Sequence, residues 1–406
     1  MAEKIIFNSE DSSGDRLSIL QKDIITGFAP AKPLDEPCII KVVGVGGGGG
    51  NAVTHMYKEG IHNVSFALCN TDRQALNHSP VPFHVQLGKK GLGAGGDPEK
   101  AREAAGESID DLRTMLSDGT EMVFITAGMG GGTGTGAAPV IARLAKEMGI
   151  LTVGIVTIPF WLEGTAKILL ALKGVEEIEK NVDALLVINN ERLLEIYSHD
   201  TLKSAFKKAD NILAVSARSI AEIITIWGEQ NLDFADVNST LRQSGVAIIS
   251  SGTGSGENRL TSAIRNALKS PLLNNNDIYK AKRILLNIYH SEEQSLMIDE
   301  MKEIDAFMSR FTSGVEMMKW GSAPDENLGK DIKITILASG FDLKTIATIG
   351  KEEAEEKKAK EKIEVYYPPK RGVYPKPFIF TSEDMNDNPA IEAILNQPAY
   401  KNRMIS

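Results

Sequence analysis

Two glycine-rich segments constrain the fold of this chain more than any other feature of its sequence. GVGGGGGN at 44–51 and GMGGGTGTG at 128–136 each follow a short apolar run and open a helical pattern. Glycine permits a tight turn there, and it lets backbone N–H groups approach an anion at the positive end of the helix. The segments therefore predict two phosphate-binding strand-to-helix turns within one sheet.

The alternation of strand and helix patterns agrees with that prediction. Apolar runs typical of buried strands begin at Cys38, Val64, Met122, Leu151 and Ala184. Helical patterns that can cover the sheet lie at 99–117, 137–147 and 166–180. Such an order is typical of βαβ units, so the first part of the chain is predicted to be an α/β domain with a parallel sheet.

A second, smaller α+β domain is predicted after a long connecting helix. The amphipathic pattern from Ile212 to Trp227 indicates that helix, and Gly228 is a plausible C-terminal glycine. Further strand candidates lie at 246–250, 283–290, 315–321 and 331–339. A length of 406 residues also suits two domains with tails, since a domain takes roughly 100 to 200 residues.

Composition excludes several classes of function. A net charge of -9 argues against a nucleic-acid partner, because phosphate-backbone binding needs clustered Lys and Arg. The start of the chain lacks the apolar core of a signal peptide, and the whole sequence has two cysteines, Cys38 and Cys69. We therefore expect the protein to be located in the reducing cytoplasm. The most apolar stretch, 150–162, is shorter than the roughly 20 residues of a membrane-spanning helix, which predicts no direct membrane insertion.

The first glycine loop alone leaves the ligand open. Gly44, Gly46 and Gly49 satisfy G-x-G-x-x-G, and Asp72 follows the second strand, where a dinucleotide fold holds ribose. A Rossmann oxidoreductase is therefore one alternative, whereas a P-loop is excluded because G-x-x-x-x-G-K-[ST] does not occur. The second loop favours a triphosphate, which needs more donors than one loop supplies.

The string GGGTGTG at 130–136 resembles the signature loop of the tubulin/FtsZ family of GTPases. NTD at 70–72, GLGAGGDP at 91–98 and NLDFADV at 231–237 occur in that family's order. The resemblance implies a tubulin-like α/β fold with these parts: a flexible arm at 1–37, a GTP-binding domain at 38–210, a central helix at 211–230, a smaller α+β polymerisation domain at 231–341, a disordered charged and proline-rich linker at 342–386, and a docking peptide at 387–406.

By this resemblance, the phosphates of GTP or GDP lie against three backbone segments. These are Gly47, Gly48, Gly49, Gly50 and Asn51; Ala94, Gly95 and Gly96, which sense the γ-phosphate; and Gly130, Gly131, Gly132, Thr133, Gly134, Thr135 and Gly136, whose threonines donate hydroxyl hydrogen bonds. Asp72 belongs to the same implied site. Mg²⁺ is expected to be bound mainly through phosphates and water, without side-chain ligands assigned to it.

The same resemblance implies contacts to the nucleoside. Glu163 matches the ribose contact, and Asn190 and Phe206 match the groups that bond to and stack on guanine. Lys167 stands where the family usually has Arg, which reduces a bidentate contact to a point charge. Asn211 stands at the place of the guanine-reading Asp. Without the family motifs, Glu163 and Lys167 read equally well as a helical i,i+4 pair.

Asp233 and Asp236 are the predicted catalytic residues, assisted by Asn231. Their spacing by itself favours a helix cap, and acidic residues suit a helix N-terminus. Two carboxylates that orient water could also complete a site for phosphoryl transfer, which mostly requires positioning. The resemblance implies that they act on the nucleotide of the neighbouring subunit, so that the active site exists only in the filament.

The implied function is a GTP-dependent, self-assembling cytoskeletal GTPase of the cytokinetic ring at midcell. Its expected partners are further copies of itself and, through 387–406, membrane-tethering and regulatory division proteins. The alternative within the same family is a filament protein that binds GTP and hydrolyses it weakly, because of Lys167 and Asn211.

Overall fold

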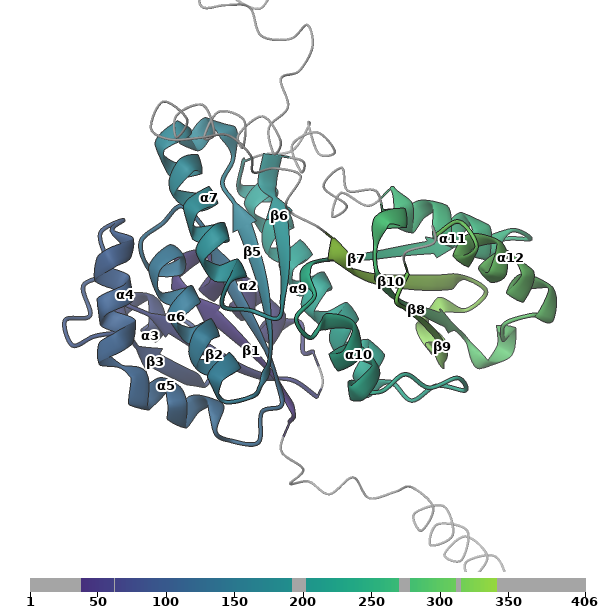
Figure 1. Cartoon of the computed structure of the whole chain (residues 1–406), viewed down its shortest axis with the longest axis horizontal. Coiled ribbons are helices and arrows are strands. Elements are labelled where there is room, and N and C mark those ends of the chain that lie inside the picture. Colours follow the sequence, from purple (N-terminus) through teal and green to yellow (C-terminus); the bar gives the residue numbers. More distant parts are fainter. Residues whose placement is uncertain (1–37, 62, 192–201, 270–277, 312–314, 342–406) are drawn as a thin grey trace, which may run out of the picture. The chain divides into compact units, whose positions relative to one another are not determined.

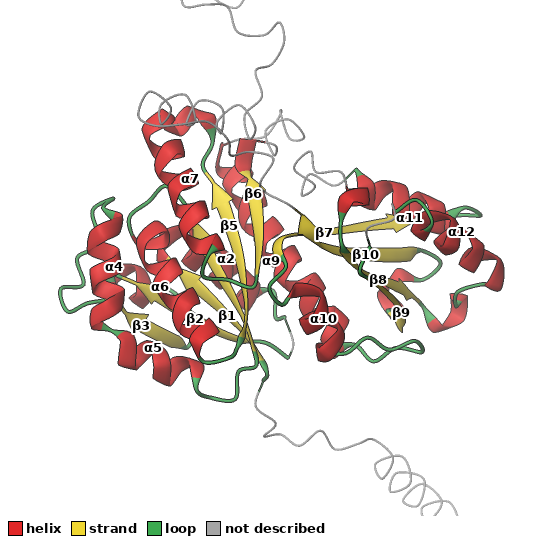
Figure 2. Cartoon of the chain, in the orientation of Figure 1, coloured by secondary structure: helices red, strands yellow, loops and turns green. Residues whose placement is uncertain are grey.

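The computed structural model describes residues 38–61, 63–191, 202–269, 278–311 and 315–341, with the backbone alone for 202–207. Helices and strands alternate along the first half of these residues, as Figures 1 and 2 show. The predicted arm at 1–37, the linker at 342–386 and the docking peptide at 387–406 lie outside the described residues.

The five strands predicted for the first half are present. Its elements are β1 (Ile40–Val45), α2 (Gly46–Lys58), β2 (Ser65–Asn70), α3 (Arg73–Asn77), β3 (Phe83–Gln86), α4 (Pro98–Glu107), α5 (Ile109–Leu116), β4 (Met122–Gly128), α6 (Thr133–Glu147), β5 (Leu151–Ile158), α7 (Thr165–Glu179) and β6 (Ala184–Asn189). The helix predicted at 99–117 is divided at Ser108, whose hydroxyl accepts a hydrogen bond from Gly88 N at 2.9 Å. β3 was missed because it is short and half of it is exposed.

The second half contains the four strands predicted for it. Its elements are α9 (Leu202–Thr225), α10 (Phe234–Leu241), β7 (Gly245–Gly254), α11 (Arg259–Leu268), β8 (Arg283–His290), α12 (Ile298–Met308), β9 (Met317–Pro324) and β10 (Ile332–Phe341). The central helix, predicted at 211–230, begins earlier and ends earlier. Gly228 does not cap it; a Cβ at Gly228 would lie 2.1 Å from Ser322 O of β9, so glycine is needed for that close approach.

The strands of the described residues form one sheet of mixed direction. Their order is β3-β2-β1-β4-β5-β6-β7-β10-β8-β9. Pairing is parallel from β3 to β7, although β6 and β7 share only Ala184↔Gly245 and Leu185↔Val246; β10 is antiparallel to both β7 and β8. The short β6–β7 contact divides a parallel part from a mixed part, which agrees with an α/β domain followed by an α+β domain.

Helices cover both faces of the parallel part. In β1, Val43 and Val45 face the core beneath α4, α5, α6 and α7, whereas Ile40 and Val42 face the core beneath α2, α9 and α10. This second core also contains residues of β7, β8 and β10, so α9 belongs to both parts of the sheet. Parallel strands place their carboxyl ends at one edge, and the loops that follow β1, β2, β3 and β4 are therefore brought together there.

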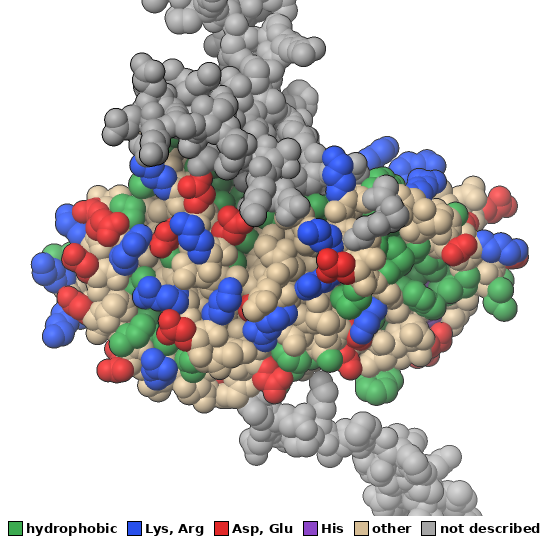
Figure 3. Space-filling view, viewed as in Figure 1, with side chains coloured by type: hydrophobic (Ala, Val, Ile, Leu, Met, Phe, Trp, Pro, Cys, Tyr) green, Lys and Arg blue, Asp and Glu red, His purple; other side chains and the backbone are tan. Residues whose placement is uncertain are grey.

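Basic and acidic side chains alternate over the face shown in Figure 3. Among the helices that the structure describes, none combines the length and the apolar character required to cross a bilayer.

Candidate functional site

The three predicted phosphate-binding segments meet at the carboxyl ends of the parallel strands. Thr71, after β2, and Thr133, at the start of α6, share a hydrogen bond of 2.7 Å between their hydroxyl oxygens. Gly93 N, in the loop after β3, donates to Thr71 O at 3.0 Å. A Cβ at Gly132 would lie 2.9 Å from Ala94 Cβ, so the second glycine loop and the 94–96 loop are in close contact.

A cavity of about 410 Å³ opens between the two glycine loops, α7 and α9. This volume lies within the range of small-molecule and cofactor sites. The predicted residues that line it are Gly47, Gly48, Asn51, Gly131, Gly132, Thr133, Gly134, Glu163, Lys167 and Asn190. Lining residues that were not predicted are Gly128, Met129, Thr157, Pro159, Ala209, Asp210 and Leu213.

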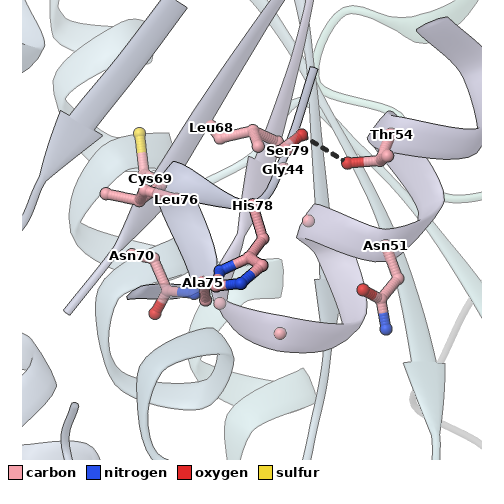
Figure 4. A pocket seen from close by; sticks show the side chains of 13 residues that line it. Gly44, Asn51, Thr54, Leu68, Cys69, Asn70, Ala75, Leu76, His78 and Ser79 are labelled. Carbon is pink, nitrogen blue, oxygen red and sulfur yellow. Dashed lines mark hydrogen bonds between the residues drawn. The ribbon is translucent and has the colours of Figure 1, made fainter. Parts of the chain in front are cut away.

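A smaller pocket of about 140 Å³ lies on the other side of the first turn of α2, against β2 and α3 (Figure 4). Thr54 and Ser79 share a hydrogen bond of 2.7 Å at this pocket. Gly47 and Asn51 line both spaces, and Gly50 lines only the smaller one. The first turn of α2 therefore presents backbone to an open space on two sides.

The glycines of the two loops have different tasks. A Cβ at Gly47, Gly50 or Gly131 would meet no atom within 4 Å, so these positions are open to a ligand. By contrast, a Cβ would lie 2.0 Å from Thr126 O at Gly49 and 2.0 Å from Pro98 O at Gly136. These two glycines are required where helices α2 and α6 pack against β4 and α4, and they do not line the cavity.

Other glycines shape the loops themselves. Gly130 has φ +95° and would place a Cβ 2.8 Å from Lys167 O, so it serves the turn and its contact with α7. Gly95 and Gly96 have φ of +61° and +80°, a region that favours glycine, and both are exposed beside buried Ala94. The 94–96 loop contacts the glycine loop but does not line the described cavity.

The two predicted threonine donors are not equivalent. Thr133 lines the cavity, whereas Thr135 is buried and its hydroxyl accepts a hydrogen bond from Gly130 N at 2.9 Å. Thr135 therefore holds the loop in shape instead of facing the ligand. Asp72 also serves local structure, because its Oδ1 caps α3 by accepting from Gln74 N at 2.9 Å, and it lines neither pocket.

Glu163 and Lys167 line the cavity as an i,i+4 ion pair. Glu163 Oε1 accepts from Phe160 N at 2.8 Å, and Glu163 Oε2 accepts from the Lys167 ammonium. Lys167 remains 43% exposed, so its ammonium can still reach a ligand. The helical-pair interpretation and the ligand-contact interpretation are thus compatible.

The end of the cavity between Asn190 and α9 contains one predicted residue and one that was missed. Asn190 is buried, and within the described part of the chain its Oδ1 has no hydrogen-bond partner, which leaves an acceptor for a ligand. Asn211 is exposed and does not line the cavity, whereas Asp210, one position earlier on α9, does. The side chain of Phe206 lies outside the described residues.

Asp210 could have been found from the helical period. It lies on α9 beside Ala209 and Leu213, which are both buried and one turn apart, so the helix turns Asn211 away from that face. Burial raises the pKa of Asp210 to about 6, while the charge of His55 acts in the opposite direction. An acceptor carboxylate at this place suits a ligand with adjacent N–H donors.

The predicted catalytic residues lie at the other end of α9. Asp233 and Asp236 form a reciprocal cap: Asp236 N donates to Asp233 Oδ1 at 3.0 Å and Asp233 N donates to Asp236 Oδ2 at 3.1 Å. Asn231 Oδ1 accepts from Gly228 N at 3.1 Å. The capping interpretation is confirmed, and none of the three residues lines the cavity of the same chain.

Comparison with known proteins gives consistent matches. The model of the "Tubulin/FtsZ family, GTPase domain" matches residues 39–198, and that of the "FtsZ family, C-terminal domain" matches 245–342. The cell division protein FtsZ of Porphyromonas gingivalis is 52% identical over 390 residues, 90% of this chain and 85% of that protein. FtsZ of Aquifex aeolicus is 44% identical over 313 residues, 75% and 84%. The structure of an empty FtsZ dimer from M. jannaschii has a TM-score of 0.68 at 37% identity, covering 81% of this chain and 93% of that one.

Proposed function

The chain belongs to the tubulin/FtsZ family of GTPases, and we propose that it assembles head to tail and hydrolyses GTP at the contact between subunits during cell division. Membership of this family removes the Rossmann oxidoreductase as an alternative. The cavity at the carboxyl ends of β1, β4, β5 and β6 is the proposed GTP site. The loop at 228–236 is the proposed donor of catalytic carboxylates to the next subunit.

The separation of these two regions carries the proposal. Asp210 of α9 lines the cavity, and the helix continues to Thr225 before the carboxylate loop begins. At about 1.5 Å per residue, the rise from Asp210 to Thr225 is about 22 Å. Asp233 and Asp236 therefore cannot attack, or orient water at, the nucleotide of their own chain. A second copy placed head to tail brings its loop to that nucleotide.

Exposed apolar side chains support a contact at both regions. Trp227, directly before the carboxylate loop, is 81% exposed. Leu92, beside the 94–96 loop, is 87% exposed, and Leu162, beside Glu163, is 63% exposed. Apolar side chains around both the cavity and the loop would be buried if the two regions met, which favours association.

Within the cavity we assign the triphosphate to the glycine loops and the base to Asn190 and Asp210. The open backbone at Gly47 and Gly131 suits phosphate, and the Asp210 carboxylate suits the adjacent N–H donors of guanine. In the described ranges, no three His, Cys, Asp or Glu side chains gather to hold a metal ion. Mg²⁺ would then be held mainly by phosphate oxygens and water, where it neutralises phosphate charge.

Phosphate release measured against protein concentration tests the proposal. We expect the rate per subunit to be near zero below a threshold and to rise above it, and Asp236→Ala to lack that rise while still binding GTP. A rate per subunit that stays constant on dilution would show a self-contained GTPase. That result would remove Asp233 and Asp236 as donated residues.

The cellular part of the proposal concerns residues outside the described ranges. We propose that filaments form the cytokinetic ring at midcell and that the peptide at 387–406 docks onto membrane-tethering and regulatory division proteins. The resemblance of its NQPAY string to the family's terminal peptide supports this. Weak hydrolysis remains the alternative, supported by Lys167 being paired with Glu163 instead of offering a bidentate contact.

A further inference from the structure

Lys319 of β9 forms an ion pair with one of the two proposed catalytic carboxylates. Its ammonium donates to Asp236 Oδ1, while Asp236 Oδ2 accepts from Asp233 N at 3.1 Å. The Lys319 side chain is 42% exposed and that of Asp236 is 16% exposed. Both carboxylate oxygens are therefore engaged, and the plane of the carboxylate is held from two sides.

β9 also contacts the rest of the carboxylate loop at 228–236. Ser322 N donates to Gln230 O at 2.9 Å, and a Cβ at Gly321 would lie 2.6 Å from Leu232 Cγ. Alternate residues of a strand point to the same side, so Lys319 and Gly321 both face the loop. One edge strand thus sets both the backbone of the loop and the orientation of its inner carboxylate.

The charge of Lys319 matters because the loop is acidic. Glu229, Asp233 and Asp236 lie within a few residues of one another, and the proposed function brings them toward a triphosphate. Like charges repel at such distances, and a cation paired with Asp236 offsets part of that repulsion. The Lys319 ammonium is partly exposed while it is paired with Asp236. The ion pair can therefore stay intact when the loop enters a neighbouring subunit's site.

The local electrostatics keep Asp236 ionised. Burial by itself would raise the pKa of Asp236, but the hydrogen bond and charge of Lys319, with the N–H of Asp233, hold that pKa below its ordinary value. Among the described residues, Lys319 and Asp233 are the charged groups that act on the Asp236 carboxylate. Arg283 of β8 contacts the other end of α10, where it donates to Arg242 O at 2.9 Å.

We propose that Lys319 is a positioning residue for GTP hydrolysis, which holds Asp236 oriented and charge-compensated as the loop enters the neighbouring subunit's site. This inference rests on the proposed function, in which Asp236 is donated in trans. Lys319 itself is not assigned a contact with the nucleotide.

The test compares Lys319→Met, Lys319→Arg and Asp236→Ala in the full chain, with Lys302→Met as the matched control. Lys302 is also ion-paired, with Asp299 on α12, and is 80% exposed. Phosphate release is divided by sedimented polymer and followed from acidic to neutral pH. GTP binding and thermal unfolding are measured for each variant.

We expect Lys319→Met to release phosphate roughly tenfold more slowly per polymerised subunit, the scale of a misplaced catalytic group. The acidic limb of its pH profile should move to higher pH, because Asp236 protonates more readily without the lysine. Lys319→Arg should keep the rate and the position of the acidic limb close to those of the parent chain, and Lys302→Met should change neither.

Three outcomes would overturn the inference while Asp236→Ala stays inactive. The first two are a rate of phosphate release per polymerised subunit that is unchanged or faster in Lys319→Met. The third is a fall in total phosphate release that is explained by less polymer alone, with the acidic limb of the pH profile unmoved. Activity in Asp236→Ala would instead remove the proposed function, and with it the role of Lys319.

Discussion

Glycine is required for different reasons at neighbouring positions of the first glycine loop. Gly47 faces open space at the cavity, whereas Gly49 faces Thr126 O of β4 at a distance that admits no Cβ. Both belong to the same run of five glycines, and only their surroundings distinguish a ligand contact from a packing contact.

We therefore predict opposite effects for Gly47→Val and Gly49→Ala. The valine should fill ligand space and weaken GTP binding by about tenfold or more, with thermal unfolding nearly unchanged. The alanine should lower the free energy of unfolding by about 1–3 kcal/mol or prevent folding, because β4 or α2 must shift. Calorimetric GTP binding and thermal melts check both, and equal destabilisation by the two variants would contradict the assignment.

We predict that Asp210 gives the affinity for GTP a pH dependence. In the proposed site, the Asp210 carboxylate can accept from both adjacent N–H donors of guanine only when it is ionised, and burial raises its pKa to about 6. GTP affinity should be full above about pH 6 and should fall as the pH drops through that value. Titrations from pH 5 to pH 8 with GTP and ATP measure it.

The variant Asp210→Ala tests this prediction, and Asn211→Ala is its matched control because Asn211 is adjacent and exposed on the same helix. Asp210→Ala should lose both the pH dependence and most of the preference for GTP over ATP, whereas Asn211→Ala should keep them. The reverse result would return base recognition to Asn211.

At the scale of elements, α9 and β9 together place the carboxylate loop. α9 is tied to the mixed part of the sheet by Glu222, which accepts from Lys333 at 2.8 Å; the Lys333 ammonium also lies 4.7 Å from the centre of the Tyr289 ring. Gly228 then turns the chain against Ser322 O of β9. The loop is thus held by a helix end and an edge strand that are distant in sequence.

Gly228→Ala should separate binding from hydrolysis. Its Cβ cannot fit beside Ser322 O, so the loop must move, while the cavity at the other end of α9 is untouched. We expect phosphate release to fall by about tenfold or more with GTP affinity unchanged. Gly106→Ala on α4, where a Cβ meets nothing, is the control and should keep full turnover. A loss of GTP affinity in Gly228→Ala would argue that the two ends of α9 are coupled.

At the scale of the whole molecule, the cavity and the carboxylate loop are two different surfaces. A contact between different surfaces is heterologous, and unless it closes into a ring it continues into a filament. Each subunit would then use its neighbour's loop on one side and offer its own loop on the other.

Mixing Asp236→Ala with Gly47→Val should restore activity at a GTP concentration that saturates the first variant's cavity and leaves the weakened cavity of the second largely empty. Asp236→Ala keeps the cavity and Gly47→Val keeps the loop, so a junction of the first cavity with the second loop is complete. In a random equal mixture up to about one quarter of junctions have this composition. Phosphate release that appears only on mixing would support donation in trans, and its absence at concentrations where both variants co-sediment would refute it.

The sequence alone determined those features of this protein that depend on residues close to one another along the chain. Most of the strands, the two glycine turns and the Asp233 cap follow from residues within one or two turns of each other, and family motifs pointed to the loops where we propose that phosphate binds. The start of α9 at Leu202 and the short strand β3 depend on burial that no local pattern specifies, whereas the face of α9 on which Asp210 lies follows from its helical period. Lys319 reaches Asp236 across 83 residues because the order of strands, set only when the sheet assembles, puts β9 beside the loop.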